Sequence, residues 1–343
     1  MRDLLYQEID LKVIGENWDA IKQKSQKDII AVVKSRCYGL GDQRIPKFLE
    51  TIGCKILAVV DEQEALRLLE SNIKTNVLVL NSVSEEFYQM ANLYSNLIFS
   101  VNCLSDSLCL SNYSFNRKVK LHVQIDTGMN RLGFTNLSDY SMALTELLKN
   151  PNLQLEGLYT HFASPEYREQ QETRFRPFLK TYPYSIIHCA ASSTYEYSKI
   201  GNFVRVGLDL YGDGRKPHIK QSVRVGCFPL AINFVKKGES IGYDQAYKVT
   251  EDMYVAVLPI GYYNGFRRSL RGMTVLANQK RYQTIGIVCM NHLFVKVDEQ
   301  VNIDTEFIIT SLDLPMYELA QYLQTTPHEI WCMLNIDNKI YIE

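Results

Sequence analysis

Eight short apolar runs along the first two thirds of the chain most constrain what it can fold into. They lie at about residues 28–34, 54–60, 75–81, 97–101, 118–125, 154–161, 185–189 and 203–209. Amphipathic stretches separate the runs, and strands that alternate with helices form parallel sheets. Eight such strands are the number that closes a TIM-type barrel. We therefore predict an α/β fold with a (β/α)8 TIM-type barrel.

Two of the separating stretches carry helix signals of their own. The stretch after Asp61 starts with a residue type that caps helices through its carboxylate. The stretch from Leu137 has apolar residues at helical spacing and stops at Asn150-Pro151. We expect both stretches to be crossover helices of the barrel.

The rhythm changes after about residue 222. Apolar β-type runs at residues 254–260, 283–288 and 293–298 follow one another with only short polar or glycine-containing breaks. Such closely spaced strands are typical of a mainly β domain. We therefore predict two domains, a barrel over 1–222 and a C-terminal mainly β domain over 223–343.

Composition argues against several classes of partner. The chain has 37 basic and 38 acidic residues, a net charge of −1, so nothing favours nucleic acid or a membrane surface. No apolar run approaches the roughly 20 residues of a membrane span, and the N-terminus is too polar for a secretory signal. The eight cysteines are scattered, with no Cys-x-x-Cys pair and no metal-ligand spacing. We expect a cytoplasmic protein with free thiols and no metal.

Reactive side chains gather at the expected C-terminal ends of the barrel strands, where TIM-type barrels carry their chemistry. Along the chain these are Lys34, Arg131, His161, Ser192 and Arg205, and Gly207 adds a backbone N–H beside them. Lys34 leaves the first strand just ahead of Gly39 and Gly41, which let the backbone approach a ligand closely. An amine at the mouth of a strand suits a covalent aldehyde cofactor such as pyridoxal 5'-phosphate (PLP).

Each of these residues also has a purely structural interpretation. Lys34 can be a solvated lysine at a strand end, and Arg131 can form a surface ion pair. His161 can be a core imidazole, Ser192 a helix cap, and Arg205 a buried stem with a solvated head. An amine, a hydroxyl, an imidazole and two guanidinium groups at one barrel face together favour a binding site.

Seven blocks of the sequence, in the same order, resemble those of the alanine racemase family. The resemblance covers nearly the whole length and implies a PLP-binding barrel, a C-terminal β domain and a head-to-tail homodimer. The blocks are Ala31-Val-Val-Lys-Ser-Arg-Cys-Tyr-Gly-Leu-Gly, Ile125-Asp-Thr-Gly-Met-Asn-Arg-Leu-Gly-Phe, Tyr159-Thr-His-Phe-Ala, Val204-Arg-Val-Gly-Leu-Asp-Leu-Tyr-Gly, Ile241-Gly-Tyr-Asp-Gln-Ala-Tyr, Leu258-Pro-Ile-Gly-Tyr-Tyr-Asn-Gly-Phe and Val288-Cys-Met-Asn-His-Leu.

The resemblance implies a two-base reaction, because racemisation removes a proton from one face of Cα and returns it on the other. Lys34 would bind PLP covalently and then act as the base on the D face. Tyr243 of the partner subunit would be the base on the L face. A phenol has an ordinary pKa of about 10, so it needs cationic or hydrogen-bonded help. His161, linked to Arg205, is expected to supply that help.

The resemblance also assigns binding roles. Arg205 would face the pyridine nitrogen, and because a guanidinium is not deprotonated, the nitrogen would stay unprotonated and the carbanion short-lived. The cofactor phosphate would be held by the Ser192 hydroxyl, the Gly207 and Leu208 amides, and the Tyr38 hydroxyl. Arg131 and the Met290 amide would orient the substrate carboxylate.

The chain departs from the family pattern at several positions around the site. Gln124 stands where a carbamylated lysine often lies, and its amide can still accept a bond from Arg131. The C-terminal segment lacks a tyrosine that, in the family, narrows the pocket. Its loss can make room for serine or can be a neutral change in an alanine racemase, and we favour the neutral change. The altered positions are Gln124, Ala191, Val206, Asn291 and, for the missing tyrosine, Asn335 or Ile336.

The resemblance implies a PLP-dependent isomerase that interconverts L- and D-alanine and supplies D-alanine for peptidoglycan. Two alternatives keep the same fold and cofactor: a racemase for serine or for small amino acids broadly, and a non-catalytic PLP-binding relative. A barrel with the same cofactor but a different role, such as a PLP homeostasis protein or a decarboxylase, is a further alternative. Retention of Lys34, Tyr243, His161, Arg205 and Arg131 together argues against the non-catalytic relative.

Overall fold

The structure, a computed structural model, describes residues 3–343. Its contacts divide the chain into two compact units. The barrel unit comprises Trp18–Cys37 and Gly41–Asp209; the β unit comprises the described residues through Asn17 together with Tyr38–Leu40 and Leu210–Glu343. The segments through Asn17 and Tyr38–Leu40 are grouped with the β unit, so the units are not two continuous stretches of chain. The domain boundary at residue 222 stays a prediction.

Eight parallel strands close the barrel, and each overlaps one of the predicted apolar runs. They are β2 (Asp28–Val32), β3 (Ile56–Val59), β4 (Asn76–Val79), β5 (Leu97–Val101), β6 (Val119–Gln124), β7 (Leu153–Tyr159), β8 (Ile186–His188) and β9 (Phe203–Val206). The ring closes where β9 pairs with β2, with Phe203 opposite Asp28. The predicted (β/α)8 barrel is confirmed.

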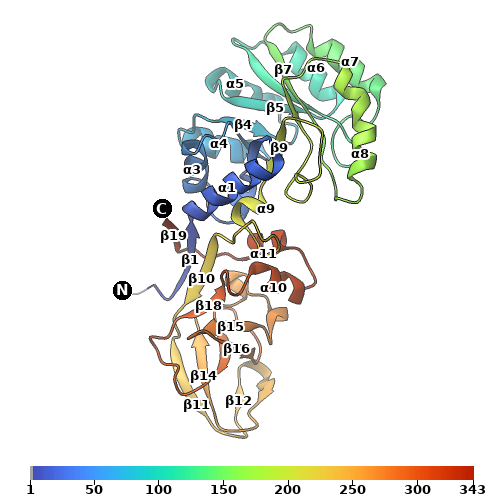
Figure 1. Ribbon diagram of the computed structural model, residues 1–343. Coiled ribbons are helices and arrows are strands. Elements are labelled where there is room, and N and C mark those ends of the chain that lie inside the picture. Colours follow the sequence, from blue (N-terminus) through green and yellow to red (C-terminus); the bar gives the residue numbers. More distant parts are fainter. Residues whose placement is uncertain (1–2) are drawn as a thin grey trace. The chain divides into compact units, whose positions relative to one another are not determined.

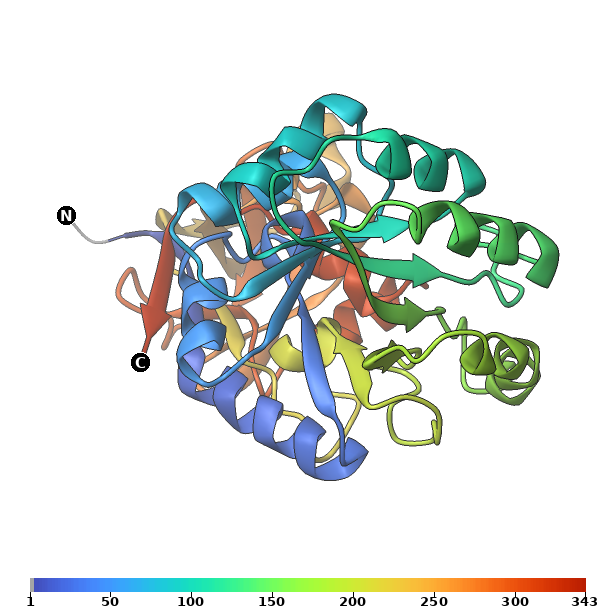
Figure 2. The same ribbon diagram turned by 90° about the horizontal axis from the view of Figure 1, so that it is seen from above.

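Helices surround the barrel; in Figure 2 those coloured light blue to green lie outside the strands. Asp61 caps α4 (Glu62–Glu70) by accepting the Glu64 N–H at 2.9 Å, and Asn136 caps α7 (Leu137–Leu147) in the same way. Both predicted crossover helices are therefore present. The elements between strands are α1 (Leu11–Ser25), α2 (Lys34–Tyr38), α3 (Arg44–Thr51), α4 (Glu62–Glu70), η1 (Glu85–Tyr88), α5 (Gln89–Leu93), α6 (Leu104–Asn112), α7 (Leu137–Leu147), α8 (Arg168–Phe175), η2 (Arg176–Lys180) and α9 (Leu208–Tyr211).

The barrel strands are apolar because they are covered on both faces. Strands β3 and β5 are buried along their whole length, as expected for parallel strands with side chains on one side and helices on the other. One core cluster consists of Ile30, Val32, Ile56, Ala58, Leu78, Ile98 and Phe203. This packing fixes the strand ends from which the site residues project.

The β unit is built on a nine-stranded sheet, which confirms the predicted mainly β domain. In spatial order its strands are β11 (Ala231–Val235), β14 (Met253–Leu258), β17 (Leu293–Val297), β16 (Lys280–Ile285), β15 (Thr274–Ala277), β18 (Phe307–Thr310), β10 (Val223–Cys227), β1 (Leu5–Asp10) and β19 (Lys339–Ile342). Strand β1, coloured blue in Figure 1, lies antiparallel to β10 and parallel to β19. The sequence reading missed β1.

Short elements complete the β unit. They are β12 (Ser240–Ile241), η3 (Tyr243–Gln245), β13 (Tyr247–Lys248), η4 (Tyr262–Asn264), η5 (Arg268–Leu270), α10 (Met316–Tyr322) and α11 (Pro327–Met333). Among residues 3–343, no helix is long and apolar enough to cross a membrane. Within residues 3–343 the eight cysteines form no disulfide, and five of them are buried.

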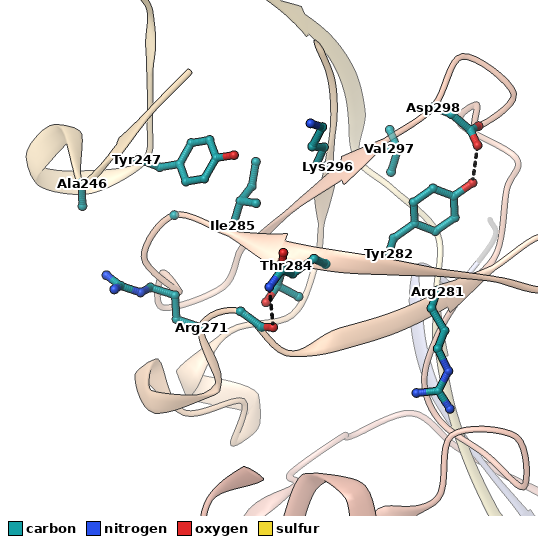
Figure 3. A pocket seen from close by; sticks show the side chains of 13 residues that line it. Ala246, Tyr247, Arg271, Arg281, Tyr282, Thr284, Ile285, Lys296, Val297 and Asp298 are labelled. Carbon is teal, nitrogen blue, oxygen red and sulfur yellow. Dashed lines mark hydrogen bonds between the residues drawn. The ribbon is translucent and has the colours of Figure 1, made fainter. Parts of the chain in front are cut away.

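A cavity of about 620 Å³ lies within the β unit. Figure 3 shows Tyr247, Arg271 and Lys296 among the side chains that line it, with the Tyr282 hydroxyl donating to Asp298 at 2.9 Å. None of its lining residues is among the site residues predicted from the sequence. The predicted site residues therefore do not line this cavity.

Candidate active site

Lys34 lies two residues beyond the end of β2, at the start of an unusual turn. The next four residues, Ser35 to Tyr38, all have positive φ between 52° and 60°, which is the left-handed helical region. For residues with a Cβ this conformation costs roughly 1–2 kcal/mol each. The Glu64 carboxylate holds the turn by accepting the N–H groups of Ser35 and Val60 at 2.5 and 2.9 Å. Such strain clusters at functional sites, and here it fixes where the half-buried lysine leaves the barrel.

Arg205, on β9, is only 5 % exposed and makes four hydrogen bonds through its two terminal nitrogens. One nitrogen contacts His188 Nδ1 at 2.7 Å and the His188 carbonyl at 3.0 Å. The other contacts the Thr160 carbonyl and His161 Nδ1, both at 2.9 Å. A guanidinium has five N–H donors. Within residues 3–343 the four bonds use the terminal N–H groups of Arg205 and none uses its Nε–H, so a single Arg205 donor remains for a ligand.

His161, just after β7, is held as a neutral imidazole. Because a guanidinium only donates, His161 Nδ1 must accept from Arg205, and the ring proton must sit on Nε2. Burial, followed by the charges of Arg205, Arg131 and Lys34, lowers the pKa of His161 to about 3. Three cations therefore act on this one ring, and the mouth of the barrel offers a positive environment that suits anionic groups.

The loop that carries Arg131 is shaped by the carboxylate of Asp126. It accepts backbone N–H groups from Gly128 at 2.7 Å, Met129 at 2.9 Å and Arg131 at 2.7 Å. Burial acts to raise the pKa of Asp126, but these bonds outweigh it and the pKa is lowered. The Arg131 side chain is exposed, at the rim of a cavity of about 10 Å³.

Gln124 was expected to accept a hydrogen bond from Arg131. In the structure its side-chain oxygen accepts the Tyr159 hydroxyl at 2.7 Å. The Ser100 hydroxyl lies 2.9 Å from the same Tyr159 oxygen and donates to it, because the single phenol proton goes to Gln124. The amide is therefore part of a buried network inside the barrel, where only 5 % of its surface is exposed.

Ser192 and the start of α9 come together at the ends of β8 and β9. The Asp209 N–H donates to the Ser192 hydroxyl at 3.4 Å. Gly207 lies between β9 and α9, and Leu208 is the first residue of α9. The first N–H groups of a helix have no acceptor within the helix, and they favour phosphate. The predicted phosphate-binding residues of the barrel unit are thus neighbours.

The other three predicted site residues belong to the β unit. Tyr38 is buried, and its ring packs 5.5 Å from Tyr211 and 6.0 Å from His328. Tyr243, which opens η3, is 64 % exposed, and Met290 is 52 % exposed. Tyr243, predicted to act through its phenol, and Met290, predicted to act through its backbone amide, are therefore both exposed at the surface of this chain.

Two family models match the chain. The one described as "Alanine racemase, N-terminal domain" matches residues 9–215, and "Alanine racemase, C-terminal domain" matches residues 227–341. The chain belongs to the alanine racemase family. Together the two models span the barrel and most of the β unit, so the resemblance seen in seven sequence blocks is confirmed.

Individual relatives agree in sequence and in fold. The chain is 32 % identical to the alanine racemase of Limosilactobacillus fermentum, over 94 % of this chain and 93 % of that protein. It is 29 % identical to alanine racemase 1 of Bacillus subtilis, over 96 % and 90 %. The alanine racemase structure from Clostridium difficile 630 superposes with a TM-score of 0.91 at 26 % identity, covering 100 % and 97 %. A histidine racemase from Leuconostoc mesenteroides, at 21 % identity and a TM-score of 0.88, shares the fold.

The sequence reading missed residues that lie behind Arg205 in this member of the family. His188 Nε2 lies 2.9 Å from His122 Nδ1, and His122 Nε2 lies 3.4 Å from the Glu156 carboxylate. Both rings are fully buried, and burial lowers the pKa of each. The available signal was a histidine inside each of two apolar strands, which alone did not reveal their mutual contact.

Proposed function

We propose that the chain is a PLP-dependent alanine racemase, an isomerase that interconverts L- and D-alanine. The observation that carries the proposal is the cluster of Lys34, Arg131 and Arg205 around a neutral His161 in a member of this family. We further propose that the protein works in the cytoplasm and supplies D-alanine for peptidoglycan. Each residue of the cluster has a definite task in that reaction.

The residues present fit PLP. Lys34 provides the amine for covalent attachment, and the single uncommitted N–H of Arg205 fits an aromatic nitrogen that only accepts. Ser192, with the Gly207 and Leu208 amides and the Tyr38 hydroxyl, would hold the phosphate. When bound, the cofactor supplies an electron sink that acidifies the amino acid Cα. Arg205 cannot give up a proton, so it keeps the ring nitrogen unprotonated and weakens that sink.

Two bases on opposite sides of the substrate would move the proton. Lys34 would take or return it at Nζ on the D face, and Tyr243 of the partner subunit would do so on the L face. The neutral His161 presents its Nε2–H as a donor, which stabilises a phenolate by hydrogen bonding rather than by charge. Arg131, with the Met290 amide of the partner subunit, would fix the substrate carboxylate. A head-to-tail homodimer follows from this assignment.

The deciding experiment is Cα deuterium exchange and chirality inversion in heavy water, with L-alanine and L-serine given separately to PLP-loaded protein. We expect inversion of alanine, followed by NMR and by chiral chromatography. Lys34→Ala should lose the visible absorbance of covalently bound cofactor and all exchange. Bound cofactor without exchange of either amino acid would refute the racemase. Covalent absorbance in Lys34→Ala would refute the attachment site.

Serine is the second candidate substrate, and the C-terminal segment favours it. Where the family resemblance expects a tyrosine that narrows the pocket, the chain has Asn335 or Ile336; the first is exposed and the second is 1 % exposed. Neither supplies a phenol ring. Faster inversion of serine than of alanine in the same experiment would assign this substrate instead.

A further inference from the structure

A hydrogen-bonded chain leads from Arg205 through the interior of the barrel to a carboxylate. His188 Nδ1 lies 2.7 Å from an Arg205 terminal nitrogen, and His188 Nε2 lies 2.9 Å from His122 Nδ1. His122 Nε2 then lies 3.4 Å from Glu156. No exposed atom interrupts the two rings, since both side chains are fully buried.

The direction of every bond in this chain follows from Arg205. A guanidinium only donates, so His188 Nδ1 must accept, and a neutral ring then carries its proton on Nε2. That proton is donated to His122 Nδ1, so His122 in turn carries its proton on Nε2 and donates it to Glu156. Each ring thus has one allowed tautomer, and all donors point from the guanidinium towards the carboxylate.

The chain links a buried cation to its counter-charge. Among residues 3–343 no carboxylate forms an ion pair with Arg205 within 4.0 Å, although burying a charge without compensation is costly. Glu156, in contrast, is half-buried in the barrel wall, and burial acts to raise its pKa. Its hydrogen bond to His122 and its ion pair with Lys120, whose Nζ lies 3.4 Å away, outweigh burial and lower the pKa of Glu156. Glu156 is therefore ionised. It contacts the Lys120 cation directly and is linked to the Arg205 cation through the two histidines.

We propose that His188 and His122 are positioning residues that couple the Glu156 carboxylate to Arg205. They hold the guanidinium so that only its Nε–H faces the site, and they keep the compensating carboxylate two imidazole rings away. A carboxylic acid placed directly against a pyridine nitrogen would share a proton with it. The relayed arrangement compensates Arg205 without offering the nitrogen a transferable proton. This inference rests on the proposed function and deepens it.

Packing holds both rings in the required orientation. The Tyr159 ring stacks on His188 with 4.6 Å between centroids and 9° between planes. A Cβ built on Gly157 would lie only 2.5 Å from the His122 ring, so glycine is needed where the two strands pass. Neither ring can turn over without meeting these neighbours.

The tautomers can be read directly in cofactor-free protein with ¹⁵N-labelled histidine. The chain has only six histidines, so substitution of each assigns its signals. We expect His188 and His122 to show protonated Nε2 and unprotonated Nδ1 throughout the pH range in which the protein stays folded. A protonated Nδ1 on His188, or conversion of either ring to imidazolium near its ordinary pKa of about 6.5, would overturn the proposal.

Two variants of His188 separate positioning from packing. Glutamine offers a carbonyl and an amide N–H spaced much like the two ring nitrogens, whereas phenylalanine fills space without accepting. The readout is His161, whose pKa is lowered first by burial and then by the charge of Arg205. We expect the pKa of His161 to be unchanged in His188→Gln and to change in His188→Phe, where Arg205 loses an acceptor. The same value in both variants would show that His188 does not act through Arg205.

Glu156→Gln removes the charge at the far end, and Glu172→Gln is its matched control. Glu172 is buried in the same unit, but it pairs with Arg168 at 2.9 Å and not with the chain. We expect both to lower the urea midpoint and only Glu156→Gln to shift the His122 and His188 signals. Unshifted signals in Glu156→Gln would overturn the coupling. Because all these signals come from cofactor-free protein, intact tautomers without racemisation would refute the proposed function alone.

Discussion

Gly157→Ala is the substitution whose cost can be worked most directly from the structure. Gly157 lies on β7 with its missing Cβ aimed at the imidazole of His122, on the neighbouring strand β6. A methyl group there would meet Cγ and Cδ2 of the ring at 2.5 Å and Nδ1 at 2.6 Å. The ring would have to retreat by about 0.9 Å to reach an ordinary contact of 3.4 Å.

That retreat lengthens two hydrogen bonds at once, because His122 is held by His188 on one side and by Glu156 on the other. A neutral bond contributes roughly 0.5–1.5 kcal/mol and a bond to a charged group roughly 1.5–3 kcal/mol. Alanine has less backbone entropy than glycine in the unfolded state, which offsets roughly 0.4–1 kcal/mol of this loss. We therefore expect Gly157→Ala to reduce the free energy of unfolding by about 2–3 kcal/mol.

The assay is urea unfolding of cofactor-free protein, with His122→Ala and the double variant measured beside it. His122→Ala removes the ring that the methyl would strike, so in that background Gly157→Ala should cost less than about 0.5 kcal/mol. The reasoning is refuted if Gly157→Ala is within about 0.5 kcal/mol of the parent. An undiminished cost in the double variant would refute it equally, because the clash would then lie elsewhere.

Three further predictions concern His161, the turn after Lys34 and Tyr243. His161 binds a proton below about pH 6.5 in the unfolded state but only below about pH 3 in the folded state. Its contribution to the free energy of unfolding is therefore fully present above pH 6.5 and is lost as the pH falls. At pH 5 the loss from this residue alone is about 2 kcal/mol. Urea titrations at pH 7 and 5 measure this, and an equal or larger loss in His161→Gln would contradict it. Ser35→Gly, at φ 53°, should raise the unfolding free energy by about 0.5–1 kcal/mol; a lower urea midpoint would argue against strain there. Tyr243→Phe should slow Cα deuterium exchange of L-alanine more than that of D-alanine, whereas equal slowing would count against two bases.

The sequence was most informative about elements whose signal lies within a few consecutive residues. Apolar runs reveal barrel strands because both faces are covered, and Asp61 reveals a helix start because its cap forms within three residues. Strand β1 was not found, since its alternating pattern is short and its partners, β10 and β19, lie far along the chain.

Around the site, sequence supplied the residue types but not their arrangement. The left-handed turn over Ser35–Tyr38 contains none of the glycine or asparagine that favours positive φ, so only the surrounding structure specifies it. His188 and His122 stand on β8 and β6, with β7 between them. Their contact crosses the barrel interior, which no local pattern encodes.

The position of β1 has a consequence for the order in which the chain acquires structure. Synthesis proceeds from the N-terminus, so the whole barrel is made before β10, the antiparallel partner of β1. The backbone donors of β1 therefore stay unpaired until β10 is synthesised and Glu8 pairs with Arg224. Its other edge stays open longer still, until Lys339–Ile342 arrive as β19. An open edge invites pairing with another nascent chain. Gln7, Glu8 and Asp10 make this strand half polar, which makes it a poor template for aggregation while it waits.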